Sequence, residues 1–203
     1  YRFLLFILSV LGVYLQLTKH GGFGMMLYYT ILSNMLVMFF MGDMVWRMLR
    51  GRSTQTQSYL SMKGAVTMAI MITFVIYHFM LAPLATPEKF YRLENFLCHY
   101  IVPLMFFFDT LVIDKAKQYR KFDPFLWTSI PLAYMLFALL NGLVLKWPIP
   151  GAKDSPFAYF FINVTKYGWA FVGKRVVIIF IAYLLAGYVL YGIKNIKRKS
   201  AVS

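Results

Sequence analysis

The chain has 203 residues, of which 61% are hydrophobic and 14% are charged, and its mean hydropathy is +0.65. Soluble domains contain roughly 45–50% apolar and about 25% charged residues, so this composition excludes an ordinary soluble domain. A formal charge of +14 would suggest nucleic-acid binding in a soluble protein, but the basic residues here lie between apolar runs. We therefore predict one integral membrane domain, residues 1–203, with no nucleic-acid partner. With Cys98 as the single cysteine, an intrachain disulfide and a cysteine-based metal site are excluded.

Six apolar runs are long enough, or nearly so, to cross a bilayer as helices, which predicts an all-α, six-helix transmembrane bundle. The predicted spans are residues 2–18, 23–49, 64–84, 94–113, 124–145 and 174–193. No small-residue cleavage pattern follows the first run, so we interpret it as a retained helix and not a signal peptide. The long connection 146–173 contains an aromatic stretch at 157–169, which is typical of an interfacial or re-entrant segment.

The basic residues divide unevenly between the two sides of this topology. Thirteen Lys and Arg lie on the side with both termini and the connections 50–63 and 114–123, and eight lie on the other side. Three of the thirteen, Lys197, Arg198 and Lys199, belong to the C-terminal tail. Because an excess of Lys and Arg marks cytoplasmic loops, we predict that both termini are cytoplasmic.

The second run carries polar side chains in an otherwise apolar segment. Thr30, Ser33 and Asn34 stand at i, i+3 and i+4, so on a helix they form one stripe. Lipid does not solvate such a stripe, so we expect it to face the protein interior or a cavity. The plainer interpretation is that these side chains form hydrogen bonds between membrane helices.

The predicted topology converts sequence position into depth at about 1.5 Å per residue. His78 in the third span, His99 in the fourth and Asn141 in the fifth then fall in the same outer layer as the Thr30 stripe. Asp43 and Asp109 fall in a second layer near the cytoplasmic face, where we expect them to hold Arg47 and loop lysines.

The outer layer contains a nucleophile and a base. A threonine hydroxyl becomes a nucleophile when a base removes its proton, and histidine is the usual base near neutral pH. We predict that Thr30 and His99 are catalytic and meet across a cavity enclosed by spans 2, 3 and 4. We expect Met105, Phe106 and Phe107 to line it and Asn34, Ser33, His78 and Asn141 to bind substrate. We also expect Asn34, His78 or Tyr100 to orient His99, and Pro103 to bend span 4.

Two other function classes fit the same residues. A bis-histidine haem or metal protein would use His78 and His99 as ligands, because they lie on neighbouring spans at similar depth. A transporter subunit or scaffold with a polar cavity would need no turnover at all. The hydrolase interpretation requires no metal and no cofactor. The sequence does not define an oligomeric state.

Two motifs resemble the androgen-induced protein / ADTRP-like family of small integral membrane proteins, in particular its bacterial members. The similarity lies in Tyr29-Thr30-Ile31-Leu32-Ser33-Asn34, in Asn95, His99, Val102 and Asp109, in Asp123-Pro124, and in the run from Tyr159 to Val164. The animal members are threonine hydrolases that act on fatty acid esters of hydroxy fatty acids. The resemblance implies a multi-pass protein of the bacterial inner (plasma) membrane that hydrolyses fatty-acyl esters, with Thr30 and His99 as its essential residues. The Ser33-Asn34 pair is a bacterial-type feature that does not match the animal enzymes.

Overall fold

The computed structural model describes residues 1–152 and 155–195, and within these ranges the regular structure is entirely helical. Six helical segments are long and apolar enough to cross a membrane, which confirms the predicted number of spans. Three of them begin the chain: Arg2–His20 (α1), Tyr29–Leu49 (α2) and Gln57–Leu84, whose first part is α3 (Gln57–Ile76). The fourth, Leu93–Ile113, contains α5 (Leu93–Phe96) and α6 (Val102–Phe108), and the fifth, Asp123–Leu145, contains α7 (Asp123–Trp127) and α8 (Ser129–Leu140). The sixth is Val164–Asn195 (α9).

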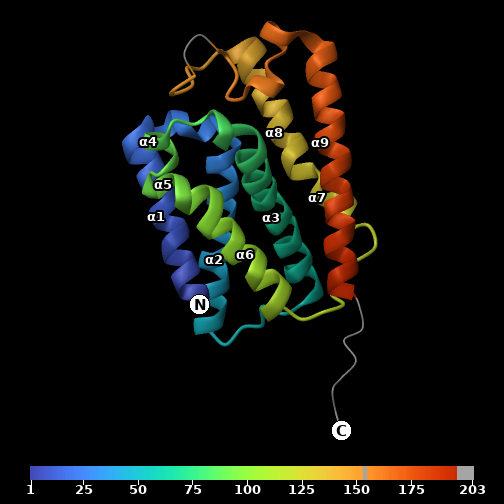
Figure 1. The fold of residues 1–203 in the computed structure, drawn as a ribbon. Coiled ribbons are helices and arrows are strands. Elements are labelled where there is room, and N and C mark those ends of the chain that lie inside the picture. Colours follow the sequence, from blue (N-terminus) through green and yellow to red (C-terminus); the bar gives the residue numbers. More distant parts are fainter. Residues whose placement is uncertain (153–154, 196–203) are drawn as a thin grey trace.

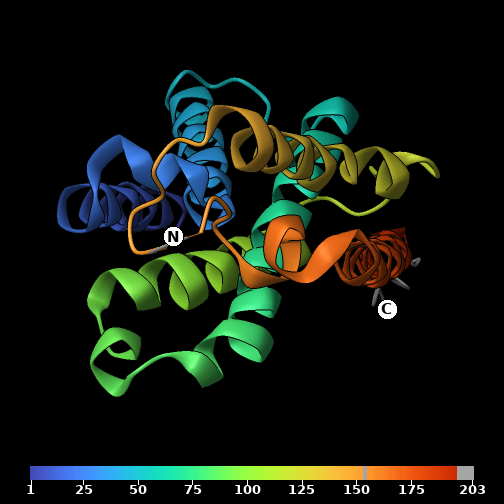
Figure 2. The ribbon, with the colours of Figure 1, turned by 90° about the horizontal axis from the view of Figure 1, so that it is seen from above.

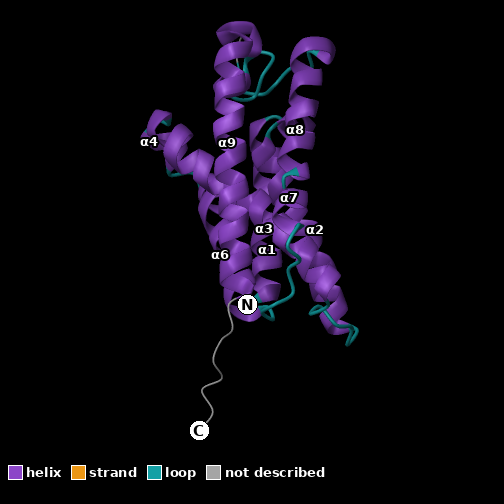
Figure 3. Cartoon of the chain, turned by 90° about the vertical axis from the view of Figure 1, so that its right-hand side faces the viewer, coloured by secondary structure: helices purple, strands orange, loops and turns teal. Residues whose placement is uncertain are grey.

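The helices form two groups (Figure 1). In the first group, α1, α2, α3 and α6 pack around a core that includes Val37, Met41, Ile70 and Phe106. The second group consists of α8 and α9, which lie to one side and extend beyond the end of the first group (Figure 3). Seen from above, the chain between α8 and α9 passes over the first group (Figure 2). This arrangement brings the aromatic residues of that connection above the N-terminal end of α2.

Three predicted boundaries were wrong. The second span begins at Tyr29 and not at residue 23, because Gly22–Leu27 forms a separate 3-10 helix before it. The third span begins at Gln57 and not at residue 64, so the stretch predicted to be a connection already contains two turns of α3. The last helix begins at Val164, although Gly168 interrupts it with φ 78°, a left-handed conformation that favours glycine. The predicted interfacial segment thus divides at residue 163 into an irregular part and the first turns of α9.

Four π-helical turns occur in the described part of the chain, and two of them end two residues before a proline. Tyr77–Leu81 extends α3 and is followed by Pro83, while Leu97–Ile101 links α5 to α6 and is followed by Pro103. Proline has no N–H to donate, so a carbonyl in the preceding turn loses its partner. Turns of this kind occur frequently at functional sites.

A buried charge cluster closes one end of the first group. We define it as Arg2, Lys63, Asp109 and Asp114. Arg2 bonds both carboxylates at 2.9 and 2.8 Å, and Lys63 pairs with Asp109 and also with Asp114 at 2.6 Å. The side chains of Lys63 and Asp109 are fully buried.

The cluster corrects one expectation about the cytoplasmic layer. Asp43 pairs with Arg47 at 2.6 Å in a part-exposed i, i+4 contact, as predicted. Asp109 pairs with Lys63, one of the lysines predicted to lie in a connection, but Lys63 lies within α3, and Arg2 near the N-terminus is a second partner that was not predicted. Lys63 was assigned to a connection because a charge normally ends an apolar run, whereas here two carboxylates neutralise it inside the bundle.

Both ends of the described chain lie at the end of the bundle that holds the charge cluster (Figure 1). Arg2 contacts Asp114 there, and Lys194 near the end of α9 donates to the Asp114 carbonyl at 2.7 Å. Residues 196–203, including Lys197, Arg198 and Lys199 of the charge count, lie outside the described residues.

We predict that reporter fusions after residue 203 and within 146–156 will report opposite sides of the membrane, with the C-terminal fusion cytoplasmic. The reason is the excess of Lys and Arg on the side that carries the termini. A fusion after Arg52 is the control and should match the C-terminal one. Equal signals from the fusions at 203 and 146–156 would contradict the six-span topology.

Candidate functional site

The structure brings Thr30 and His99 within hydrogen-bonding distance. Thr30 is in the first turn of α2, and His99 is in the π-helical turn Leu97–Ile101. The distance between Thr30 Oγ1 and His99 Nε2 is 3.3 Å. His99 is 8% exposed, so water has little access to its ring. This separation is slightly longer than the roughly 2.6–3.2 Å over which a general base takes a proton, and such contacts commonly shorten when substrate binds.

A backbone carbonyl determines which nitrogen of His99 carries the proton. The Nδ1 atom lies 3.0 Å from the Asn95 carbonyl oxygen. A carbonyl only accepts, so Nδ1 is the donor, and in the neutral ring Nε2 has a free lone pair directed at Thr30. The ring also stacks on Tyr77 with centroids 3.8 Å apart. These contacts fix both the tautomer and the orientation of the base.

The orienting group therefore differs from the three that the sequence suggested. Tyr100 bonds His78 and not His99, and Asn34 bonds backbone carbonyls. The Asn95 side chain reinforces the arrangement, because its amide donates to Tyr77 Oη at 2.6 Å. A backbone acceptor leaves no signature in side-chain chemistry, which is why sequence reasoning missed it.

Pro103 explains how Asn34 is placed. Val102 N–H donates to the Leu97 carbonyl in the π register, so the next donor along the helix would be the missing N–H of Pro103. The Cys98 carbonyl instead accepts from Asn34 Nδ2 at 3.0 Å, and the same amide group donates to the Thr30 carbonyl at 2.8 Å. Asn34 thus joins the helix of the nucleophile to the helix of the base.

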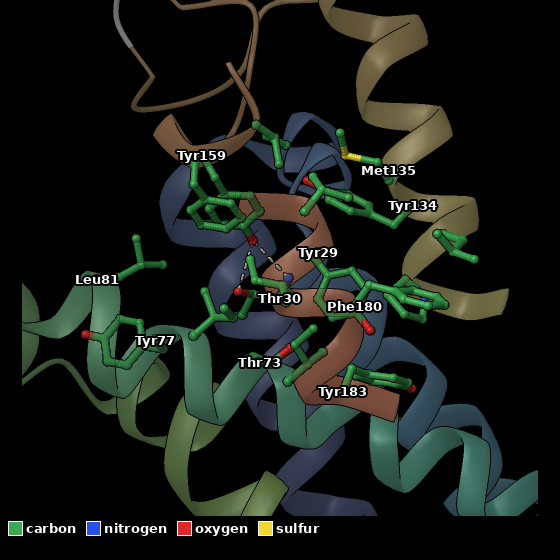
Figure 4. A pocket seen from close by; sticks show the side chains of 18 residues that line it. Tyr29, Thr30, Thr73, Tyr77, Leu81, Tyr134, Met135, Tyr159, Phe180 and Tyr183 are labelled. Atoms are coloured by element: carbon green, nitrogen blue, oxygen red, sulfur yellow. Dashed lines mark hydrogen bonds between the residues drawn. The ribbon is translucent and has the colours of Figure 1, made fainter. Parts of the chain in front are cut away.

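Tyr159 is a third polar group at the site. Its hydroxyl accepts the Thr30 backbone N–H at 3.3 Å and lies 3.4 Å from Thr30 Oγ1 (Figure 4). Burial raises the pKa of Tyr159 to about 12, so the phenol keeps its proton at neutral pH. Having accepted one hydrogen bond, it can donate its own proton to an oxygen at Thr30.

The segment that carries Tyr159 packs tightly over the site. The Phe157 ring lies against Gly142, where any side chain would overlap it. Tyr28 donates to the Pro150 carbonyl at 2.6 Å, and its ring contacts that of Tyr159 edge-on. Tyr159 lies 129 residues from Thr30 in sequence. The run that begins at Tyr159 belongs to the stretches that resemble the family, but nothing in that run indicates a contact with Thr30.

An apolar cavity of about 100 Å³ begins beside Thr30 and extends between α2, α3, α8 and α9 (Figure 4). A water molecule needs roughly 10–15 Å³ by this measure, so the space suits a slender apolar chain. The described residues that line it include no charged side chain. Its apolar walls include Ile72, Ile76, Met135, Ile162, Val176 and Ile179.

The predicted enclosure of this cavity was wrong. Span 4 provides the base but none of the lining, and α8 and α9 replace it. Met105 and Phe106 pack instead with the core of the first helix group, and Phe107 packs beside the cluster around Trp127. The sequence identified span 4 as apolar but not which of its faces meets a cavity.

The four residues predicted to bind substrate have other partners, and none of them lines the cavity. Ser33 donates to the Thr30 carbonyl at 3.0 Å and pairs with Thr73 at 2.7 Å. Asn34 links two helices as described above. Asn141 accepts Trp147 N–H at 3.1 Å and so fixes the turn after α8. These residues lie at the predicted depth but do not line the cavity, because depth in the membrane does not specify direction around a helix.

His78 does not converge on His99 as a haem pair would. Its ring stacks on Phe74, and Nδ1 faces Tyr100 Oη at 3.3 Å. Both ring nitrogens of His99 are directed at protein atoms, whereas an axial ligand directs one at the iron. Within residues 1–152 and 155–195, no group of three His, Cys, Asp or Glu side chains is placed to hold a metal ion.

Comparison of the chain with family models, with curated proteins and with solved structures finds no match.

Proposed function

We propose that this protein is an integral-membrane hydrolase of lipid acyl esters, with Thr30 as nucleophile and His99 as general base and acid. The observation that carries the proposal is the contact of Thr30 Oγ1 with His99 Nε2, at the edge of an apolar cavity. The resemblance of the Thr30 and His99 motifs to those of the androgen-induced protein / ADTRP-like family supports the same pair and implies fatty-acyl esters as substrates.

In the first half of the proposed reaction, the Thr30 hydroxyl proton passes to His99 Nε2 as Oγ1 bonds to the ester carbonyl carbon. The carbonyl oxygen becomes an oxyanion, which the Tyr159 hydroxyl and the positive N-terminal end of α2 stabilise. The tetrahedral centre then collapses, the ester C–O bond breaks, and the alcohol leaves with the proton held on Nε2. The product of this half is an acyl ester of Thr30.

In the second half, water replaces the alcohol. His99 Nε2 takes a proton from the water as its oxygen attacks the acyl carbon. The bond to Thr30 Oγ1 breaks, the fatty acid is released, and the proton on Nε2 returns to Thr30. The Asn95 carbonyl stabilises the imidazolium in both halves, because it accepts from Nδ1 throughout. The apolar cavity holds the acyl chain.

An alkyl fluorophosphonate probe tests the proposal, because it labels an activated hydroxyl and releases fluoride. We expect the wild-type protein to be labelled in detergent and Thr30→Ala to remain unlabelled. A long-chain ester added in excess should slow the labelling of the wild type. Equal labelling of the two proteins, or no labelling of either, would favour the scaffold or transporter alternative.

Tyr159→Phe should lower kcat for ester hydrolysis by about 10²- to 10³-fold, since it removes one donor to the oxyanion. KM should change little, because the donor acts mainly on the transition state. Tyr134→Phe is a matched control: its hydroxyl also belongs to this aromatic cluster but donates to the Leu27 carbonyl at 2.9 Å. Similar kcat losses for the two variants would show that Tyr159 acts only through packing.

A further inference from the structure

The hydroxyl of Tyr29, a residue in the wall of the cavity, has no role in the proposed chemistry. Tyr29, the residue before Thr30, lines the cavity, and its hydroxyl is buried without a hydrogen-bond partner among the described residues. An unpaired buried hydroxyl destabilises the folded state, because it has given up its hydrogen bonds to water, so native structures seldom contain one without a reason. A bound ligand that supplies an acceptor would remove this cost.

The neighbouring tyrosines differ from Tyr29, because their hydroxyls have hydrogen-bond partners. Tyr134 and Tyr183 line the same cavity, but their hydroxyls donate to the backbone carbonyls of Leu27 and Trp127 at 2.9 and 3.1 Å. Among the tyrosines that line the cavity, within the described part of the chain, Tyr29 is therefore the one whose hydroxyl is both fully buried and unpaired. In Figure 4 its ring lies between Thr30 and the side chains of Phe180 and Tyr183.

We propose that the Tyr29 hydroxyl is a second polar subsite, which donates a hydrogen bond to a neutral oxygen carried along the substrate's acyl chain. The oxygen is that of a hydroxyl, keto or ether group, because a phenol donates well to such acceptors. A carboxylate is disfavoured, since the described residues that line the cavity include no cationic side chain to offset the cost of burying its charge. The inference rests on the proposed function only in taking the acyl chain as the occupant of the cavity.

The subsite predicts selectivity for oxygenated chains. One neutral hydrogen bond contributes about 0.5–1.5 kcal/mol, which corresponds to roughly two- to tenfold in affinity. Binding is measured for two long-chain methyl esters of equal length, one plain and one with a mid-chain keto group, by displacement of a fluorescent fatty-acid probe. The measurements use Thr30→Ala protein in detergent, so that turnover does not interfere.

We expect the keto ester to bind about two- to tenfold more tightly, and we expect this preference to disappear in Thr30→Ala/Tyr29→Phe. The control Thr30→Ala/Tyr183→Phe should keep the preference, because the Tyr183 hydroxyl already has a partner. Equal binding of the two esters, or a preference that survives Tyr29→Phe, overturns the subsite. A preference lost on Tyr29→Phe in a protein that hydrolyses no ester supports the subsite and refutes the proposed hydrolase.

Discussion

Thr30→Ala should lower the turnover of a long-chain 4-nitrophenyl ester by roughly 10³- to 10⁶-fold, the range over which loss of a nucleophile reduces hydrolase rates. His99→Ala should cause a loss of similar size, because the base lies 3.3 Å from the same hydroxyl. The double variant should be little worse than either single one, since the two groups act as one unit. Steady-state rates of purified protein in detergent measure all three.

Two further variants distinguish catalysis from packing. Thr30→Ser keeps a hydroxyl in place and should retain measurable turnover. His78→Ala should retain turnover within a few-fold of wild type, because His78 bonds Tyr100 and lies outside the cavity wall. Full activity in Thr30→Ala, with unchanged thermal stability, would reduce the Thr30 contacts to ordinary hydrogen bonds between helices.

Lys63→Met should destabilise the fold by about 3–5 kcal/mol, as expected when one partner is removed from a buried ion pair. The substitution leaves two buried carboxylates, Asp109 and Asp114, with Arg2 as their remaining charged partner in the cluster. Denaturant unfolding in detergent, followed by tryptophan fluorescence, measures the loss.

The part-exposed pair of Arg47 and Asp43 provides the control for this prediction. Arg47→Met should cost no more than about 1 kcal/mol, because exposed ion pairs contribute little. Lys63→Met/Asp114→Asn removes one charge of each sign, and it should be less destabilised than Lys63→Met alone. Equal stability of Lys63→Met and Arg47→Met would contradict the inference that burial makes the cluster essential.

The sequence was most informative about the membrane helices, because the apolar composition of a segment alone determines whether it can cross a bilayer. A run of apolar residues that matches the thickness of a bilayer has few alternatives to a membrane helix, so all six spans were predictable. The boundary at α3 was not predictable from hydropathy. In the sequence, the charge of Lys63 indicates the end of a span. Only the tertiary structure shows that Asp109 and Asp114 lie beside Lys63 and pair with it inside the bundle.

The depths predicted from sequence position put Thr30 and His99 in one layer of the membrane, and in the structure their side chains lie 3.3 Å apart. Depth could not show that Asn141 closes a turn or that His78 stacks on Phe74, because both outcomes depend on rotation about the helix axis. Tyr159 and the Asn95 carbonyl were beyond prediction for a different reason. Tyr159 comes from an irregular segment far from Thr30 in sequence, and the Asn95 carbonyl is a backbone group of α5.

The most direct test of the proposed mechanism is the mass of the trapped acyl-enzyme. Wild-type protein is mixed with a long-chain 4-nitrophenyl ester, quenched in acid during turnover and digested, and the peptides are sequenced by mass spectrometry. The mechanism predicts the acyl mass on Thr30, and its absence from His99→Ala treated in the same way. Turnover without an adduct on Thr30, or with the acyl group on Ser33 or Tyr159, would contradict it.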